Sequence, residues 1–231
     1  MDKLVDYLCI IQARINSTRL PAKVMLDLAG KTLLERVVET VFKSKKIGKI
    51  IVATSEEKDD TIIAKKMQNL DIDCFRGDLK NVLKRFYDAS QQFPSKNIVR
   101  ITADNPLMDA KVIDMLVNDF EHSKADYAMY KNGVYGLSAE VFTVKALTFA
   151  YENAKEEFDK EHVTPYIKNN LSTHIIDIEE KYKIPDLSAT VDTLQDYIKM
   201  QNFYLYCLEK GLESSIDNYI ERYTGEEKYN Y

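Results

Sequence analysis

The first hundred residues alternate short apolar runs with amphipathic segments, and this alternation limits the fold more than any other feature. The apolar runs at 7–13, 49–55, 71–77 and 97–104 are rich in Ile and Val, which predicts strands. Between them, segments 31–44, 58–70 and 79–93 repeat apolar side chains at intervals of three and four, which predicts helices. Strand–helix repeats with short connections imply right-handed crossovers. The sequence therefore predicts an α/β fold with a doubly wound, mostly parallel mixed sheet and helices on both faces.

The second half of the chain is less regular. We expect a helix at 110–121, a strand at 126–130, another strand at 173–179 and a helix at 194–210. We interpret residues 131–171 as an inserted arm, and residues 189–192 as a short apolar strand. Residues 212–231 are polar and rich in tyrosine, and we assign them no structure. No internal repeat or low-complexity linker is present, so we expect residues 1–231 to form one domain.

Composition excludes several classes of function. The formal net charge is -5, so a general nucleic-acid-binding surface is not expected, although a local cationic pocket is compatible with it. The apolar runs are much shorter than the roughly 20 residues that span a bilayer, so no membrane segment is predicted. The three cysteines are isolated, without a C-x-x-C pair or a secretory signal, which indicates a reducing compartment. We expect a cytoplasmic protein.

Positive charge is concentrated directly after the first predicted strand. Arg14, Arg19 and Lys23 occur within twelve residues, together with Ser17. Guanidinium groups bind phosphate oxygens bidentately and lysine adds a point charge, so a loop at the end of a strand suits a di- or triphosphate. The alternative is an ordinary solvated basic loop. Neither a G-x-x-x-x-G-K-[ST] nor a G-x-G-x-x-G motif is present, which argues against ATPases of the P-loop type and against NAD binding.

Two aspartates follow predicted strands at the same edge of the sheet. Asp104 lies beside Asn105 and Pro106, and Asp192 precedes Thr193. Carboxylates facing a phosphate-binding loop are suitable ligands for Mg²⁺, which proteins hold by one or two carboxylates plus phosphate and water oxygens. Each aspartate has a structural alternative, because Asp104 can cap a turn and Asp192 lies where a helix favours acidic residues.

Six strings resemble, in order, those of the cytidylyltransferase family. They are IIQARINSTRLPAK, IIVATS, CFRGDLKNVLKRF, IVRITADNPLMD, EHVTPYI and ATVDT, and they extend from residue 8 to about 205. That family includes CMP-acylneuraminate and CMP-Kdo synthetases, and the strings are most similar to the spore coat polysaccharide biosynthesis protein F type. The resemblance implies a nucleotide-diphospho-sugar transferase fold, dimerisation through the inserted arm, and transfer of CMP from CTP to an acceptor with release of pyrophosphate.

The resemblance also implies roles for individual residues. It assigns Arg14, Arg19 and Lys23 to the triphosphate, with Ser17 as an additional donor, and Asp104 and Asp192 to magnesium. It places Thr54, Ser55 and Arg76 near the base and ribose. It gives Arg100 a supporting role in the same nucleotide site. For Arg76 and Arg100 the alternative is a salt bridge to a neighbouring carboxylate. Glu140 and His162 are candidates for acceptor binding, and His162 is alternatively a structural residue of the dimer interface.

The chain also departs from the family pattern. Asn16 and Ala22 stand where the family commonly has glycine, Ser138 replaces an acid, and Leu194 replaces a proline. The change at Ser138 leaves the acceptor unassigned. The general base is also unassigned, because Asp104 can serve as the base only if it is not occupied by metal. Two other functions stay open at this point. One is a nucleotidyltransferase that uses another nucleoside triphosphate on a sugar or polyol phosphate. The other is a catalytically inactive nucleotide-binding scaffold.

Overall fold

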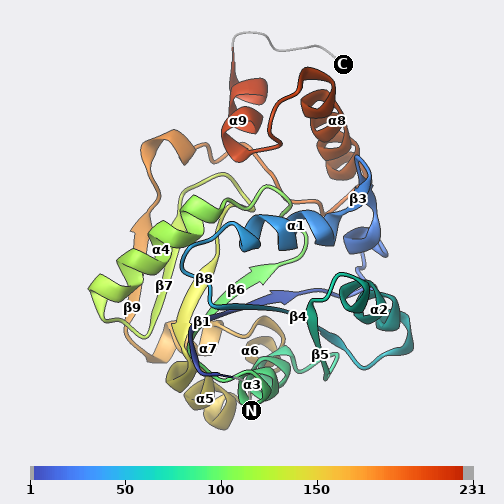
Figure 1. Cartoon of the computed structure of the whole chain (residues 1–231). Helices are drawn as coiled ribbons and strands as arrows, with labels where there is room; N and C mark the ends of the chain where they lie inside the picture. Colours follow the sequence, from blue (N-terminus) through green and yellow to red (C-terminus); the bar gives the residue numbers. More distant parts are fainter. Residues whose placement is uncertain (1–2, 226–231) are drawn as a thin grey trace.

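A seven-stranded mixed sheet forms the centre of the computed structural model, which describes residues 3–225 (Figure 1). The strand order is β5-β4-β1-β6-β8-β7-β9. Neighbouring strands are parallel except beside β8, which is antiparallel to both β6 and β7. The predicted doubly wound, mostly parallel sheet is confirmed. The strands are β1 (Val5–Gln12), β4 (Lys49–Ser55), β5 (Asp73–Gly77), β6 (Ser95–Thr102), β7 (Tyr127–Lys131), β8 (Glu140–Thr143) and β9 (Thr173–Asp177).

Helices cover both faces of this sheet because consecutive strand residues point to opposite sides. In β1, Cys9 and Ile11 join one apolar cluster, whereas Leu8 and Ile10 join the other, and all four are fully buried. Burying an aliphatic side chain of this size contributes about 1.5–3 kcal/mol. The first cluster includes α1 (Leu33–Phe42), α2 (Thr61–Asn69) and α4 (Ala110–Ser123), and the second includes α3 (Val82–Gln92), α5 (Val144–Asn153) and α7 (Pro165–Asn170).

The direction in which the chain crosses the sheet reverses between β1 and β6. From β1 the chain passes to β4 and β5 on one side, and it then returns to β6 on the other side of β1. A small hairpin of β2 (Asp27–Leu28) and β3 (Lys31–Thr32) precedes α1. Gln12 and Thr102 are paired at the carboxyl ends of β1 and β6. In open α/β sheets, ligands bind in the crevice at such a reversal.

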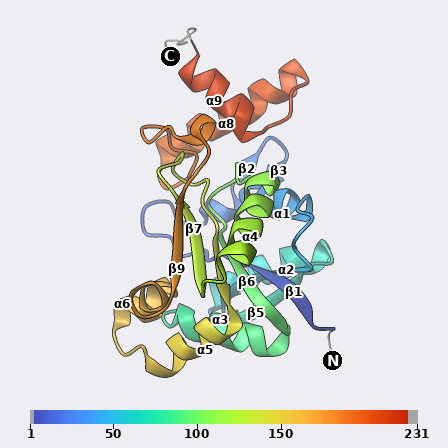
Figure 2. The ribbon, with the colours of Figure 1, turned by 90° about the vertical axis from the view of Figure 1, so that its left-hand side faces the viewer.

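Residues 131–171, which we expected to form an inserted arm, contribute to the sheet and to one helical layer. They include β8, which lies inside the sheet between β6 and β7. They also include α5, α6 (Glu157–His162) and α7, and both α5 and α6 pack against α3. Figure 2 shows these helices gathered at the end of the molecule opposite α8 and α9.

The C-terminal part contains α8 (Leu194–Lys210) and α9 (Ile216–Thr224) after a short turn, η3 (Glu180–Tyr182). The expected strand at 189–192 is wrong. That segment is extended, but it hydrogen-bonds two separate loops, through Ala189 N to Tyr135 O and Val191 N to Asp104 O. Residues 226–231, part of the stretch left unassigned, lie outside the described residues. Among residues 3–225, no helix is long and apolar enough to cross a membrane.

Candidate active site

The loop after β1 folds back on itself and is tied to the turn before α2. The Ile15 N–H donates to the Asp60 carboxylate at 2.7 Å, and the Ile15 carbonyl accepts from the N–H groups of Ser17 and Ala22 at 2.8 Å. Asp60 lies in the short turn η2 (Lys58–Asp60), and it also accepts from the N–H and hydroxyl of Ser55. Because Asp60 is buried, it needs these donors to replace water. They fix the loop against the end of β4.

Ala22 gives this loop its return path. It has φ 58° and ψ 17°, in the left-handed region, immediately before the short turn η1 (Lys23–Met25). A residue with a Cβ loses about 1 kcal/mol in that conformation, which explains why glycine is common there in the family that the sequence resembles. Asn16, the other such position, is not among the residues with positive φ. Of the two departures, only Ala22 therefore adopts a conformation that favours glycine.

A cavity of about 250 Å³, which we call the loop cavity, separates this loop from the carboxyl ends of β1 and β6. The loop supplies the three predicted cations, and Arg14 and Arg19 are exposed whereas Lys23 is buried. Three positive side chains around one cavity attract a polyanion. Its lining is Gln12, Ala13, Arg14, Ser17, Thr18, Arg19, Lys23, Val24, Thr102, Ala103, Asp104 and Asp192.

Lys23 brings the two predicted carboxylates together. Its Nζ lies 2.7 Å from an oxygen of Asp104 and 2.8 Å from an oxygen of Asp192, although the aspartates are far apart in sequence. Arg19 forms a further ion pair with Asp192 at 2.8 Å. Thr193 begins α8 with a capping box to Asp196, so Asp196 makes the helix-capping contacts and the Asp192 side chain is left to face the cavity.

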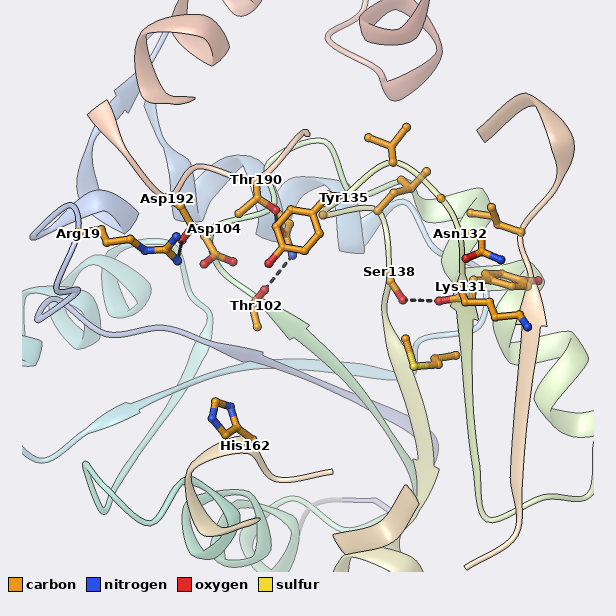
Figure 3. Close-up of a pocket in the computed structure, with 18 residues that line it drawn as sticks. Arg19, Thr102, Asp104, Lys131, Asn132, Tyr135, Ser138, His162, Thr190 and Asp192 are labelled. Atoms are coloured by element: carbon orange, nitrogen blue, oxygen red, sulfur yellow. Dashed lines mark hydrogen bonds and ion pairs between the residues drawn. The ribbon is translucent and has the colours of Figure 1, made fainter. Parts of the chain in front are cut away.

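A larger space of about 680 Å³, the broad pocket, adjoins the loop cavity and shares Arg19, Thr102, Asp104 and Asp192 with it. In Figure 3 these residues lie at one end of the pocket, Lys131 and Asn132 lie at the other, and His162 comes from a separate wall. The remaining lining comes from Asn105, residues 129–138, Ile178 and Thr190.

Asn105 joins two walls of the broad pocket. It donates to the Thr102 hydroxyl at 2.8 Å and accepts from the Thr190 hydroxyl at 2.7 Å. Gly136 packs against this bridge with φ 96°, and a Cβ at that position would lie 2.4 Å from the Thr190 Oγ1. A side chain at residue 136 would therefore break the bridge and change the shape of the pocket.

A third space of about 440 Å³, the side pocket, continues from the broad pocket past His162, Tyr135 and Ser138. Glu140 lies at its centre. It is ion-paired with Arg100, it accepts from Tyr127 and from Thr164 at 2.8 Å, and Lys168 approaches it to 3.4 Å. Burial alone would raise the pKa of Glu140, but the two cations and the two hydroxyl donors lower that pKa to about 2. Glu140 is therefore ionised and fully occupied by neighbouring side chains.

His162 is held by an unusual turn between α6 and α7. Val163 has φ 71° and ψ -56°, and the Thr164 N–H donates to the His162 carbonyl at 2.8 Å, which defines a γ-turn. Such a conformation is strained for a buried β-branched residue. The His162 ring packs on Phe158 and lines both the broad pocket and the side pocket. The turn places His162 at their junction.

The residues expected near the base and ribose lie apart from the three cavities just described. Thr54 and Ser55 are fully buried at the end of β4, and Ser55 binds Asp60. Arg76 donates to the carbonyls of Ser55 and Glu57 at 3.0 and 2.8 Å. Arg100 is different, because it lines the side pocket and forms the ion pair with Glu140 that was its structural alternative.

Comparison with known proteins identifies the family. The family model described as cytidylyltransferase matches residues 8–225. This chain belongs to the cytidylyltransferase family. It is 42% identical to the uncharacterized protein MJ1063 of Methanocaldococcus jannaschii over 84% of this chain and 83% of that protein. It is 31% identical to the spore coat polysaccharide biosynthesis protein SpsF of Bacillus subtilis, covering 86% of each chain.

Structural similarity agrees with this assignment. The structure of a cytidylyltransferase from Leptospira borgpetersenii superposes with a TM-score of 0.86 at 26% identity, covering 95% of this chain and 94% of that one. The resemblance inferred from six strings is thus confirmed, and so is the nucleotidyltransferase fold that it implied.

The carboxylate pair of this cytidylyltransferase fits the magnesium ion that the resemblance implies. Asp104 and Asp192 offer hard oxygen ligands, and both already accept a hydrogen bond from one cation, the Lys23 ammonium. Within the part of the chain that the structure describes, no three His, Cys, Asp or Glu side chains are grouped so as to hold a metal. The pair therefore suits an ion whose coordination is completed by phosphate oxygens and water.

Sequence reasoning missed three residues of this cytidylyltransferase site: Gln12, Asp60 and Asn105. Gln12 and Asn105 are part of the quoted strings; Gln12 ends β1 and Asn105 lies three residues after the end of β6, so their position was a usable signal. Asp60 gave no such signal, because an aspartate beside a helix start is normally interpreted as a cap.

Proposed function

We propose that this cytidylyltransferase transfers CMP from CTP to an acidic sugar or a related small acceptor, with release of pyrophosphate, in surface polysaccharide or glycan biosynthesis. The observation that carries the proposal is the continuity of the loop cavity and the broad pocket. The loop cavity, whose cationic side chains suit a triphosphate, adjoins the larger broad pocket, and Arg19, Asp104 and Asp192 line both. The reacting phosphorus belongs at this shared wall.

The reaction at this wall is a displacement at phosphorus. An acceptor oxygen attacks the α-phosphorus of CTP and forms the new P–O bond, the bond to the oxygen bridging to the β-phosphorus breaks, and pyrophosphate departs with the electron pair. The acceptor proton passes to solvent or to a base that we leave unassigned. Arg14, Arg19 and Lys23 stabilise the negative charge that grows on the departing pyrophosphate.

Magnesium is part of the proposal. Asp104 and Asp192 would hold Mg²⁺, which when bound neutralises phosphate charge and orients the triphosphate. Lys23 would then exchange its two carboxylate partners for phosphate oxygens. Its Nζ has three donors and no acceptor, so an anion is the natural replacement partner.

The acceptor class rests on charge around the broad and side pockets. In the side pocket, Arg100 and Lys168 face one carboxylate, Glu140. Over the broad and side pockets together there are four lysines and arginines against three carboxylates, and two of those carboxylates, Asp104 and Asp192, are the proposed magnesium ligands. An excess of cationic side chains favours an acidic acceptor. The role in spore coat polysaccharide biosynthesis for which SpsF of Bacillus subtilis is named is consistent with a sugar acceptor.

Nucleotide choice is tested by thermal denaturation of the whole chain with CTP, UTP, GTP or ATP, each with and without Mg²⁺. A ligand at 100 times its Kd that binds only the folded state adds about 2.7 kcal/mol, which raises Tm by several degrees at this chain length. We expect CTP with Mg²⁺ to give the largest rise. Equal rises with all four would contradict the choice of CTP, and no rise with any would contradict nucleotide binding by this chain.

Catalysis is tested by pyrophosphate release from CTP in the presence of a panel of eight- and nine-carbon sugar acids, amino sugar acids, and sugar or polyol phosphates. Release with a sugar acid supports the proposal, and release only with a phosphorylated acceptor contradicts the acceptor class. The homodimer through residues 131–171 stays a prediction, which sedimentation of the purified chain would test.

A further inference from the structure

Polar side chains form a connected row across the carboxyl end of the sheet, on the face that α3 and α5 cover. The row consists of Gln12 in β1, Arg100 in β6 and Glu140 in β8, and these three strands lie side by side in the sheet. Arg100 and Glu140 are directly paired in the register of their strands. The row begins at the loop cavity, which Gln12 lines, and ends at the side pocket, which Arg100 and Glu140 line.

The guanidinium of Arg100 is held on both sides. Its Nε and Nη2 lie 3.4 and 3.2 Å from the Oε1 of Gln12, and its Nη1 donates to the Glu140 carboxylate. Glu140 is fixed in turn by Tyr127 and Thr164. Two donors aimed at one oxygen and a third at a carboxylate use the planar fork of arginine, which a lysine ammonium on a flexible stem cannot reproduce.

This arrangement determines which end of the Gln12 amide faces the loop cavity. Arg100 can only donate, so the Gln12 oxygen must be turned toward it. The amide nitrogen then faces away from Arg100. Among residues 3–225, none accepts a hydrogen bond from that Nε2, and Gln12 is only half-buried. Gln12 thus offers two N–H donors at the end of β1, beside Arg14 and Thr102.

We propose that Gln12 is a nucleotide-binding donor and that Arg100 acts through it as a positioning residue, without binding the nucleotide itself. The inference rests on the proposed function, since it concerns the ligand of the loop cavity. It specifies how Arg100 would perform the supporting role that the family resemblance gave it. It also gives a role to the hydrogen bonds that join the Arg100–Glu140 ion pair of the side pocket to Gln12 at the end of β1.

The decisive variants are Arg100→Lys and Gln12→Met, alone and combined. Arg100→Lys keeps a cation beside Glu140 but removes the fork that orients Gln12. Gln12→Met keeps the length of the side chain and removes its donors. Arg36→Lys is the matched control, because Arg36 also holds its neighbours with a forked guanidinium, donating to the Leu28 carbonyl, but lines none of the three cavities. The measurements are the Kd of CTP with Mg²⁺ by calorimetry and the Tm of the ligand-free chain.

We expect Gln12→Met to raise the Kd about tenfold, the usual loss of one hydrogen bond to a charged ligand. Arg100→Lys should raise it several-fold, and the double variant should bind no more weakly than Gln12→Met alone, because Arg100 has no effect once Gln12 is gone. Arg36→Lys should leave the Kd unchanged. Additive losses would show that Arg100 acts on the nucleotide independently, and an unchanged Kd in Gln12→Met would remove Gln12 from the site. Either result overturns the inference.

Two outcomes separate this inference from the proposed function. If the wild-type chain binds another nucleoside triphosphate in place of CTP, the proposed nucleotide is wrong and the same cycle is measured with the nucleotide that binds. If it binds none, both proposals fail together. Should Arg100→Lys not fold, the variant Arg100→Gln with Glu140→Gln removes both charges at once and leaves no unpaired carboxylate, and the same dependence on Gln12 is expected.

Discussion

The loop cavity and the broad pocket share a wall, yet they are assembled differently. Apart from Thr102, Ala103, Asp104 and Asp192, the loop cavity is lined by one continuous stretch, residues 12–24. The broad pocket is lined by segments from residue 19 to residue 192, joined by hydrogen bonds such as those of Asn105 to Thr102 and Thr190. A polyphosphate can be held by neighbouring residues of one loop, whereas an acceptor of defined shape needs distant segments fixed against one another.

The charges in the two regions differ in the same way. In the loop cavity Arg14 and Arg19 are exposed, so they can meet a ligand directly, although Arg19 must share or release its ion pair with Asp192. Around the side pocket, which continues the broad pocket, Glu140 and Arg100 are occupied by each other and by neighbouring side chains. The first set suits electrostatic capture, and the second suits a fixed wall.

The largest expected effect comes from removing charge at the wall that both regions share. Lys23→Ala and Asp104→Ala should each lower turnover on the order of 10³-fold at saturating CTP and Mg²⁺, because each removes charge next to the reacting phosphates. Pyrophosphate release measures this effect, and circular dichroism checks the fold. Lys31→Ala, an exposed lysine that lines none of the three cavities, is the control. A near-normal rate in either site variant would remove that residue from the mechanism.

The fixed wall around Glu140 predicts that the stability of the fold depends on pH. The pKa of Glu140 is about 2 in the folded chain, below its ordinary value of 4.5, so the ionised form stabilises the fold. That stabilisation is complete above about pH 4.5 and is lost as pH falls toward 2, and it amounts to at most on the order of 3 kcal/mol. Glu140→Gln should therefore flatten the loss of stability between these pH values. Denaturation at a series of pH values measures this, and an unchanged slope would contradict it.

Tyr135 provides a test of whether the loop cavity and the broad pocket bind different ligands. The residue is 64% exposed, and it lines the broad and side pockets but not the loop cavity. Tyr135→Ala should raise the KM of the acceptor found in the screen about tenfold, the scale of one lost aromatic contact, and leave the Kd of CTP unchanged. Equal losses for both substrates would mean that the two regions do not bind separate ligands. Tyr151→Ala, which unstacks a ring pair elsewhere on the chain, is the control.

The smallest expected effect is a change in stability, and it comes from the backbone of the loop after β1. Ala22 has φ 58°, so Ala22→Gly relieves left-handed strain and should stabilise the chain by about 0.5 kcal/mol after the greater entropy of glycine in the unfolded state is subtracted. At this chain length Tm should rise by about 1–2 °C. Ala110→Gly, at the first position of α4, should lower Tm. A fall in Tm for Ala22→Gly would contradict the strain argument.

Features with a local cause were predictable from the sequence. Periodicity located β1, β4, β5 and β6 with the helices between them, and clustered charge located Arg14, Arg19 and Lys23. Contacts between distant residues were not predictable, such as the one between Ile15 and Asp60 or the one between Gln12 and Arg100. Residues 189–192 were mistaken for a strand because an extended apolar run has the same pattern whether its neighbours are strands or loops. The hydrogen bonds and ion pairs of Glu140 were not predictable for the same reason, because its partners come from β6, β7 and α7.

Lys23 also bears on how the chain matures. Its ammonium lies between Asp104 and Asp192, and Arg19 places a second cation beside Asp192, so two cations offset the repulsion between these carboxylates before any metal binds. We therefore expect the chain to reach its native state without a metal, and on the proposed function the ion is needed only when the nucleotide binds. Purification in a chelator such as EDTA should leave the fold intact, and catalytic competence should return on adding back the divalent ion.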